Sequence, residues 1–425
     1  MKALTHGRGR AARLGITALA AATLLAACGS GSDSDDEDAT GAFEVNTEDC
    51  LDPDAATATI DGPIKVGFSV PLSGPVAGAT ELMSDGLDAR IALANDAGGV
   101  DGQQIEITYK DDAFQPDRSK SNGTEFIEKD GMDVVSVFGS GGVAAMADDQ
   151  NAACVPMLYA SASDPQFFDL EAYPWTVQFL PSARSDAKAL LTYVKENVDE
   201  PKIGVVANST AAGTVVADAF KDVAEDDGFE IVAEVEDTDP AAAAAAMKEA
   251  GVNVVFHAGV AGACTAFDTA SERVQFDPEL SMKSASCTGA AEYITAGKAA
   301  DGVVVSSYLK QIANPEVTDD PDVVEYLEAT EGAADQASSL TQAGWLIADL
   351  LVNTLTQAAE SEDGLSRLSI IEAARDQDYD LPLAIDGIHW VSSSTRPGGV
   401  NGHMPMAWNA EKQQFEQIGE VIMVD

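Results

Sequence analysis

Short apolar runs alternate with longer stretches of helical periodicity along most of the chain. Residues 64–70 form a β-branched run that ends in a Ser-Gly-Pro turn, and a second apolar run covers residues 104–109. Between the two runs, small or apolar residues recur at close to 3.6 residues, at Leu82, Gly86, Ala89, Leu93 and Ala97. This pattern predicts a β-α-β unit, which is the opening of a parallel α/β sheet.

The same alternation continues to about residue 307. In total we expect strands at residues 65–70, 104–109, 133–138, 156–159, 202–207, 230–234, 252–258 and 302–307. Helices are expected between them, and one of these has Asp239 at the N-cap and Pro240 at its first position. A Leu-Pro-Ser-Ala break at residues 180–183 separates two such repeats. The sequence therefore predicts an α/β protein with two doubly wound, Rossmann-like lobes.

The first 27 residues have the pattern of an export signal. Basic residues precede an apolar run at residues 14–27, which is too short to span a bilayer comfortably. The run ends in Leu-Ala-Ala-Cys followed by Gly, which resembles a bacterial lipobox. This resemblance implies cleavage before Cys28 and acylation of Cys28, so that lipid alone holds the exported protein on the outer face of the bacterial cytoplasmic membrane. A plain secretory signal and an uncleaved anchor are the alternatives.

Residues 28–61 form an acidic segment of low complexity. Residues 29–61 contain no Lys or Arg, so we expect a disordered tether. The spacing of the acidic residues in this segment is weakly similar to that of a calcium-binding loop. Asp38 stands where such a loop needs a glycine, which favours the tether. The net charge of the whole chain, −47, opposes binding to nucleic acid and to anionic lipid.

Four cysteines follow Cys28, and an even number in an exported chain suggests disulfides. Three pairings are possible. We favour Cys264–Cys287, which lie in one apparent αβ unit, together with Cys50–Cys154, which would pin the end of the tether to the first lobe. Four free buried thiols are the alternative. No metal site is expected, because neither a CxxC pair nor paired histidines accompany the cysteines.

Two small, hydroxyl-rich loops each follow a predicted strand. They are Gly-Ser-Gly-Gly at residues 139–142 and Ser-Ala-Ser-Asp at residues 161–164. Ligands of open α/β sheets bind beyond the carboxyl ends of the strands, where helix N-termini favour a carboxylate or carbonyl oxygen. The first loop lacks the Lys of a phosphate loop, and Phe138 stands where a nucleophile elbow around Ser140 needs glycine. The loops are thus either an oxyanion site or ordinary tight turns.

Three segments resemble the leucine/isoleucine/valine-type solute-binding proteins of ABC importers. They are PLSGPVAG at residues 71–78, NDAGGVDGQQIEI at residues 95–107 and YKDDAFQPDRS at residues 109–119. The resemblance implies the type I periplasmic binding fold, in which the chain crosses between two lobes three times and forms a three-stranded hinge. The implied lobe one is residues 62–180 plus 308–386, and the implied lobe two is residues 181–307 plus 387–425.

The resemblance implies a receptor and not an enzyme. Such a protein captures a small polar solute in the cleft between its lobes and delivers it to the permease subunits of an ABC importer. The solute implied is a branched-chain amino acid or a related carboxylate or amide. No cofactor is implied, and a monomer is expected. A ligand-sensing lipoprotein of the same fold is one alternative. An exported α/β hydrolase is another, although no nucleophile–base pair is visible for it.

The resemblance also assigns residues to the ligand site. Ser140 would grip the ligand carboxylate, the hydroxyl of Ser163 would complete the grip together with a backbone-carbonyl contact at Ser161, and the turn at residues 73–80 would line the same cleft. The full set of implied ligand-binding residues is Ser73, Ala79, Thr80, Ser140, Gly141, Ser161, Ser163, Ala212, His257 and Ser286.

The second lobe departs from the amino-acid binders. Where these place an acidic residue for the ligand ammonium, the chain has Ala-Ser-Cys at residues 285–287, and Ala79 and Ala212 replace aromatic residues. An unpaired buried ammonium is costly, so a ligand without an amino group fits equally well. His257 ends an apolar strand, and it either donates a hydrogen bond to the ligand or is an ordinary buried histidine.

Overall fold

The first lobe is built on a parallel sheet of five strands. The computed structural model describes residues 43–260 and 263–424. The strands of this sheet lie in the order β2-β1-β3-β4-β5 and span β1 (Ile64–Val70), β2 (Ile105–Asp111), β3 (Val134–Val137), β4 (Met157–Ala160) and β5 (Thr176–Gln178). Because β1 lies between β2 and β3, the loops after β1 and β3 diverge, which makes this edge the switch point of a doubly wound sheet.

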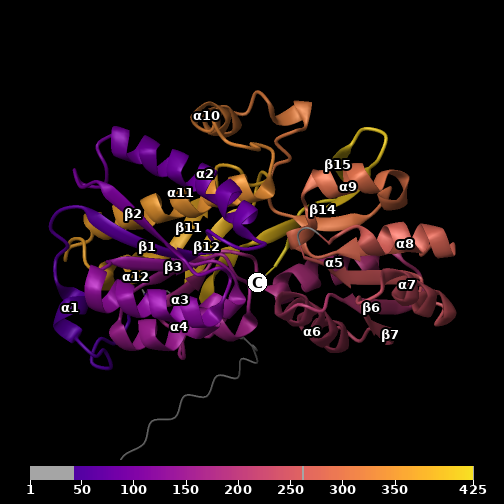
Figure 1. Cartoon of the computed structure of the whole chain (residues 1–425), viewed down its shortest axis with the longest axis horizontal. Coiled ribbons are helices and arrows are strands. Elements are labelled where there is room, and N and C mark those ends of the chain that lie inside the picture. The colour runs from indigo at the N-terminus through magenta and orange to yellow at the C-terminus, as the bar shows by residue number, and fades with distance from the viewer. Residues whose placement is uncertain (1–42, 261–262, 425) are drawn as a thin grey trace, which may run out of the picture. The chain divides into compact units, whose positions relative to one another are not determined.

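Helices cover both faces of the first sheet (Figure 1). One face carries α2 (Ala77–Asp96) and α11 (Ser339–Glu360), and the other carries α3 (Pro116–Glu125), the π-helical η1 (Phe126–Asp130) and α4 (Ser140–Ala153). Each face has its own apolar core, with Trp345 in the first and Met146 in the second. Further helices of this lobe are η2 (Pro165–Phe168), η5 (Pro315–Val317), α10 (Pro321–Ala329) and α12 (Arg367–Ala374).

The second lobe repeats the plan on a larger sheet. Its order is β15-β14-β10-β9-β8-β6-β7, with β6 (Ile203–Ala207), β7 (Ile231–Glu236), β8 (Val254–Ala258), β9 (Leu280–Lys283), β10 (Val304–Ser307), β14 (Gly402–Asn409), β15 (Gln414–Gln417) and β16 (Ile422–Met423), which pairs with β14. Strands β6 to β10 are parallel, and β14 joins β10 antiparallel. Here the switch point lies between β6 and β8.

The helices of the second lobe also lie on two faces. Buried side chains of α5 and α6 pack into one apolar cluster, and those of α7 and α8 pack into another. The helices are α5 (Ala183–Asn197), α6 (Ala211–Asp226), α7 (Pro240–Glu249), α8 (Ala266–Val274), η3 (Ala285–Cys287), α9 (Ala290–Ala296) and η4 (Gly297–Ala300). Two doubly wound α/β halves were predicted, and this is the fold observed.

A third, antiparallel sheet shows that one expected lobe boundary, at residue 387, was wrong. It consists of β11 (Gln377–Asp380), β12 (His389–Ser393) and β13 (Arg396–Val400). Trp390 of β12 is fully buried against two first-lobe rings, stacked on Phe179 at 6.1 Å between ring centroids and edge-on to Tyr159 at 5.6 Å. Residues 389–400 therefore pack with the first lobe, whereas we expected the second lobe to resume at residue 387.

The chain passes between the two sheets three times, after β5, after β10 and after β13. Residues of the second passage pair antiparallel with the segment between β11 and β12. The backbone N–H of Lys310 donates to the carbonyl of Leu383 at 2.9 Å, and that of Ile385 donates to the carbonyl of Tyr308 at 2.9 Å. This pairing fixes the second passage to the first lobe.

The acidic segment is not a tether throughout, because residues 50–60 fold onto the first lobe. Helix α1 (Pro53–Thr57) is capped by Asp52, and Ala56 and Ile60 are buried in the first-lobe core. The backbone N–H of Leu51 donates to the carbonyl of Ala152 at 2.8 Å. Ala56 and Ile60 supply the apolar contact with the first lobe. The acidic composition of the segment as a whole gave no sign of it. The export signal and Cys28 lie outside the described residues.

Both favoured disulfides are confirmed. Cys50 bonds to Cys154 with 5.5 Å between their Cα atoms, and Cys264 bonds to Cys287 with 5.6 Å. The first joins residues 104 positions apart and holds the N-terminal segment to the end of α4. Among the helices that the structure describes, none combines the length and the apolar character needed to cross a membrane.

Candidate functional site

The loops at the switch point of the first sheet lie together. The backbone N–H of Phe138 donates to the carbonyl of Ser69 at 3.1 Å, which joins the ends of β3 and β1. The backbone N–H of Gly139 donates to the carbonyl of Ser161 at 3.0 Å, which adds the loop after β4. The structure therefore brings the predicted loops at residues 73–80, 139–142 and 161–164 to one edge of the sheet.

Ser140 is the first residue of α4, after a turn that only glycine adopts easily. Gly139 has φ +91°, and its carbonyl accepts the N–H groups of Gly142 and Val143. No side chain caps this helix start. Ser140 is partly exposed and Gly141 is exposed. A hydroxyl and the positive end of a helix dipole are thus accessible at one point, an arrangement that suits an oxyanion.

The loop after β4 presents two further hydroxyls. Ser161 and Ser163 are both partly exposed. Gln178 of β5 holds the end of this loop, because its side chain accepts from the backbone N–H of Asp164 at 3.0 Å and donates to the carbonyl of Asp164 at 2.8 Å. The clamp fixes the backbone beside Ser163. Gln178 had no expected role, since β5 itself was not predicted.

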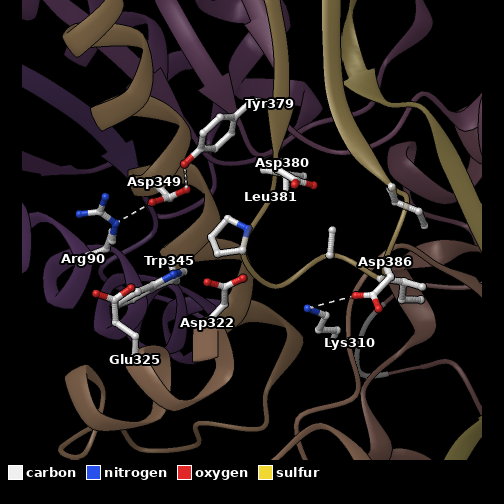
Figure 2. Close-up of a pocket in the computed structure, with 14 residues that line it drawn as sticks. Arg90, Lys310, Asp322, Glu325, Trp345, Asp349, Tyr379, Asp380, Leu381 and Asp386 are labelled. Atoms are coloured by element: carbon white, nitrogen blue, oxygen red, sulfur yellow. Dashed lines mark hydrogen bonds and ion pairs between the residues drawn. The ribbon is translucent and has the colours of Figure 1, made fainter. Parts of the chain in front are cut away.

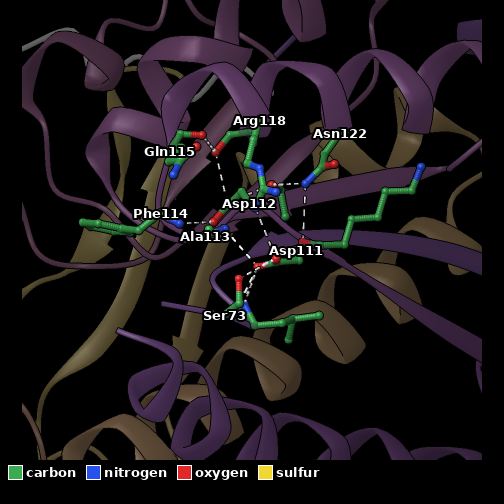
Figure 3. A network of polar contacts seen from close by, with 12 residues as sticks. Ser73, Asp111, Asp112, Ala113, Phe114, Gln115, Arg118 and Asn122 are labelled. Carbon is green, nitrogen blue, oxygen red and sulfur yellow. Dashed lines mark hydrogen bonds and ion pairs between the residues drawn. The ribbon is translucent and has the colours of Figure 1, made fainter. Parts of the chain in front are cut away.

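Two adjacent carboxylates at the end of β2 organise the loop after β1 (Figure 3). Asp111 accepts the backbone N–H groups of Leu72, at 2.9 Å, and Ser73, at 3.1 Å, and it accepts the Ser73 hydroxyl at 2.7 Å. These bonds, led by that of the hydroxyl, lower the pKa of Asp111. Asp112 is buried and accepts the hydroxyls of Ser69 and Ser119.

These aspartates belong to the segment at residues 109–119 that resembles the solute-binding proteins, and no role was predicted for them. Their sequence signal is two carboxylates directly after a strand, which is a common way to tie neighbouring loops. Ser73 is exposed, Ala79 is partly exposed, and Thr80 is buried. Within the part of the chain that the structure describes, the Thr80 hydroxyl has no hydrogen-bond partner. Ser73 therefore has a structural partner in Asp111, whereas Thr80 has an unused polar atom.

In the second lobe, His257 lies beneath the sheet edge and not at its surface. Its side chain is fully buried, with Nε2 3.0 Å from an Asp237 carboxylate oxygen and Nδ1 3.4 Å from the Lys283 ammonium. Lys283 in turn pairs with Asp268 at 2.7 Å. Burial and the nearby Lys283 charge lower the pKa of His257. These contacts match the reading of an ordinary, satisfied histidine.

The loops after β8 and β9 are tied to each other. The Ser286 hydroxyl donates to the carbonyl of Gly259 at 3.0 Å, and the Cys264–Cys287 disulfide links the same two loops. The backbone N–H of Cys264 donates to Glu292 at 2.8 Å, so the nearby carboxylate of α9 already serves the loop. Ser286 and Ala212 are exposed, at the ends of β9 and β6. The described residues 285–287 contain no carboxylate.

A separate cavity of about 510 Å³ lies beside the second passage of the chain (Figure 2). Its charged groups are largely paired. Asp349 accepts from Arg90 at 2.7 Å and from the Tyr379 hydroxyl at 2.8 Å, while Lys310 lies 2.6 Å from Asp320 and 3.5 Å from Asp386. None of the predicted ligand residues lines it. The ion pairs of Lys310 link the second passage to the first lobe.

The described residues hold no group of three or more His, Cys, Asp or Glu side chains placed to bind a metal ion. The candidate site is thus made of hydroxyls, backbone N–H groups and glycines at the switch points of two sheets. These groups can hold a polar ligand by hydrogen bonds.

Comparisons with known proteins agree with this arrangement. Leu/Ile/Val-binding protein homolog 2 of Brucella abortus is 30% identical over 204 residues, 46% of this chain and 54% of that protein. The chain thus spans about half the length of the curated relatives it matches. A branched chain amino acid ABC transporter protein of Thermus thermophilus, solved with bound valine, has a TM-score of 0.75 at 17% identity, over 86% of this chain and 98% of that one.

A second solved structure has a different ligand. The solute binding protein of an ABC transporter from Rhodopseudomonas palustris BisB5, in complex with 3,4-dihydroxy benzoic acid, has a TM-score of 0.70 at 19% identity, over 85% of this chain and 97% of that one. Residues 63–407 match the model of a periplasmic binding protein family. The predicted resemblance is confirmed, and the chain belongs to the periplasmic binding protein family, with its type I fold.

Proposed function

We propose that the protein captures a small solute outside the cytoplasm and delivers it to an ABC importer. The observation that supports this most is the gathering of hydroxyl and glycine loops at the switch points of two sheets that the chain crosses three times. A solute that contacts both lobes stabilises a closed state by hinge motion, and a permease then recognises that state. The protein acts by binding, without chemical change to the solute.

The proposed solute carries a carboxylate or a related amide. Ser140, Ser161 and Ser163 offer it hydroxyls, and the start of α4 offers a helix dipole. The names of the relatives point to leucine, isoleucine and valine. The segment at residues 285–287 offers no partner for an ammonium group, so related acids without an amino group are included in the proposal.

Substitution of Ser140 and Ser163 by alanine tests the proposal. We expect the double variant to lose binding and to keep its fold, because both hydroxyls are partly exposed and lie on loops. Thermal unfolding of the disulfide-bonded protein would be followed with leucine, isoleucine, valine and acids without an amino group. A solute present at a hundredfold excess over its Kd should raise the free energy of unfolding of the wild type by about 2.7 kcal/mol.

The matched control is Ser121→Ala, at an exposed serine of α3 that belongs to none of these loops. It should leave both the unfolding temperature and the ligand-induced shift unchanged. Equal shifts in the wild type and in the double variant would contradict the assignment of the site.

We also propose that acyl chains on Cys28 hold the protein at the membrane. Cys28→Ser would then move the protein from the membrane fraction to the surrounding medium or periplasm. Retention in the membrane fraction would point to an uncleaved signal as the anchor. The proposed working form is a monomer whose partner is the permease.

A further inference from the structure

Two large apolar side chains are exposed at the edge of the sheet that carries Ser140. Phe114 and Leu72 are each 50% exposed, and Phe114 is aromatic, unlike the other strongly exposed large apolar residues that the structure describes. They follow the ends of β2 and β1, where Asp111 pairs in register with Val70. Exposed apolar side chains beside a polar ligand loop are typical of ligand contacts.

The backbone that carries these side chains is held by the paired carboxylates. Asp111 accepts the N–H of Leu72 at 2.9 Å and that of Ala113 at 2.9 Å, and Asp112 accepts the N–H of Phe114 at 2.8 Å. Ala113 and Phe114 have φ of +49° and +60°, a left-handed conformation that such residues rarely adopt. Strained backbone held by several hydrogen bonds is common where a ligand binds. These hydrogen bonds thus hold the backbone at Phe114 in place.

The Phe114 ring lies against the turn that precedes Ser140. A Cβ atom on Gly139 would come within 2.8 Å of the ring, so glycine is needed for the ring to lie there. The ring also packs edge-on to Phe138, with 6.1 Å between centroids. Figure 3 shows the Phe114 side chain pointing away from the carboxylate network. An exposed aromatic ring thus lies beside the turn that leads to Ser140, one of the groups proposed to hold a carboxylate.

We infer that the solute is an acid whose carboxylate is joined directly to a flat apolar ring, which packs on Phe114 and Leu72. The inference rests on the proposed function and narrows its solute class. It agrees with the absence of a carboxylate at residues 285–287, since an aromatic acid has no ammonium group to neutralise. Aromatic rings attract each other in offset or edge-to-face contacts, which the exposed Phe114 ring can offer.

The test compares Phe114→Ala with the wild type by isothermal titration with three probes: benzoate, L-leucine and propionate. We expect the wild type to bind benzoate at least 30-fold more tightly than propionate. In Phe114→Ala, benzoate should bind about 30-fold more weakly, while propionate should change less than threefold. Phe114→Tyr keeps the ring and should retain most of the benzoate affinity.

Ile294→Ala is the matched control, because Ile294 is a 46% exposed apolar residue on α9. It should leave all three affinities unchanged. If Phe114→Ala weakened the binding of benzoate and of propionate equally, the Phe114 ring would contact protein and not the ring of the ligand. That result would overturn the inference and leave the proposed function standing. Tighter binding of leucine than of benzoate by the wild type would also overturn it.

A failure of the proposed function has a different signature. In that case the Ser140→Ala/Ser163→Ala variant would bind benzoate as tightly as the wild type does, or the wild type would bind none of the three probes. The second result overturns the inference as well.

Discussion

Asp186 and His403 meet at one hydroxyl in the second lobe and affect stability in opposite ways. Both are buried. The Ser306 hydroxyl donates to the Asp186 carboxylate and lies 3.3 Å from Nδ1 of His403. Burial raises the pKa of Asp186 to about 6 and lowers that of His403 to about 4. The stability contributed by Asp186 is therefore present below about pH 4 and lost as pH rises to 6. The contribution of His403 is present above about pH 6.5 and lost as pH falls to 4.

Removal of either group should abolish that group's own pH-dependent contribution to stability. In Asp186→Asn, we expect the free energy of unfolding, relative to the wild type, to fall by about 3 kcal/mol as pH decreases from 6.5 to 4. In His403→Gln, it should fall by a similar amount as pH increases from 4 to 6. Urea unfolding at several pH values measures both. Parallel pH profiles for the wild type and both variants would show that neither group titrates in this range.

At the residue scale, the positions of the hydroxyl-rich loops in the fold could be predicted from the sequence, whereas the exposure of Phe114 could not. Ser140 and Ser161 could be placed because small residues after a buried strand mark the carboxyl edge of a sheet. Phe114 could not, because a phenylalanine in a loop is usually expected to fold inward, and its exposure depends on two left-handed residues held by Asp111 and Asp112. Backbone conformation of that kind leaves no periodic signal.

At the element scale, two glycines allow α2 and α11 to touch. A Cβ on Gly86 would lie 1.9 Å from the carbonyl oxygen of Thr341, and one on Gly344 would lie 1.8 Å from that of Met83. Backbone therefore meets backbone at this crossing. We expect Gly344→Ala to cost about 3 kcal/mol, because neither helix can move away without opening the core.

Gly78→Ala is the control for this substitution, since it lies in α2 with no atom within 4 Å of an added Cβ. It should be neutral or stabilise the protein by about 0.5–1 kcal/mol. Urea unfolding of both variants compares the two sites. A Gly344→Ala variant as stable as Gly78→Ala would show that the crossing has room to relax.

The longer elements could be predicted because their hydrophobic patterns are regular. Strands β5 and β9 were not predicted. Strand β5 has only three residues, and β9 is Leu-Ser-Met-Lys, which contains no β-branched or aromatic residue. Residues 389–400 were expected in the second lobe, and this prediction was wrong. Only the packing of Trp390 on Phe179 and Tyr159 decides their lobe, and that contact joins residues about 200 positions apart.

At the scale of the whole molecule, the N-terminal segment is part of the first lobe. A chain that begins at residue 62 lacks α1 and the Cys50–Cys154 bond, which closes a loop of about 100 residues. Such a bond contributes about 4.7 kcal/mol in the chain-entropy model. We therefore expect a chain beginning at residue 62 to be several kcal/mol less stable than one beginning at residue 43.

Thermal unfolding of the two chains measures this difference. The Cys50→Ala/Cys154→Ala variant of the longer chain separates the disulfide from the packing of Ala56 and Ile60, and its stability should fall between the two. If all three unfold at the same temperature, the N-terminal segment contributes nothing to the fold.

The threefold passage of the chain has a consequence for how the protein acquires its structure after export. The first lobe lacks α11 and β12 until residues 339–393 have arrived, and the second lobe lacks β14 until residues 402–409 have arrived. Neither lobe can therefore be completed when only the N-terminal half of the polypeptide has emerged. Maturation should wait for almost the whole chain, and the unfinished lobes would expose apolar surface during that interval. Chaperones that shield apolar surface during export would therefore be needed until the strands that follow the last passage have emerged.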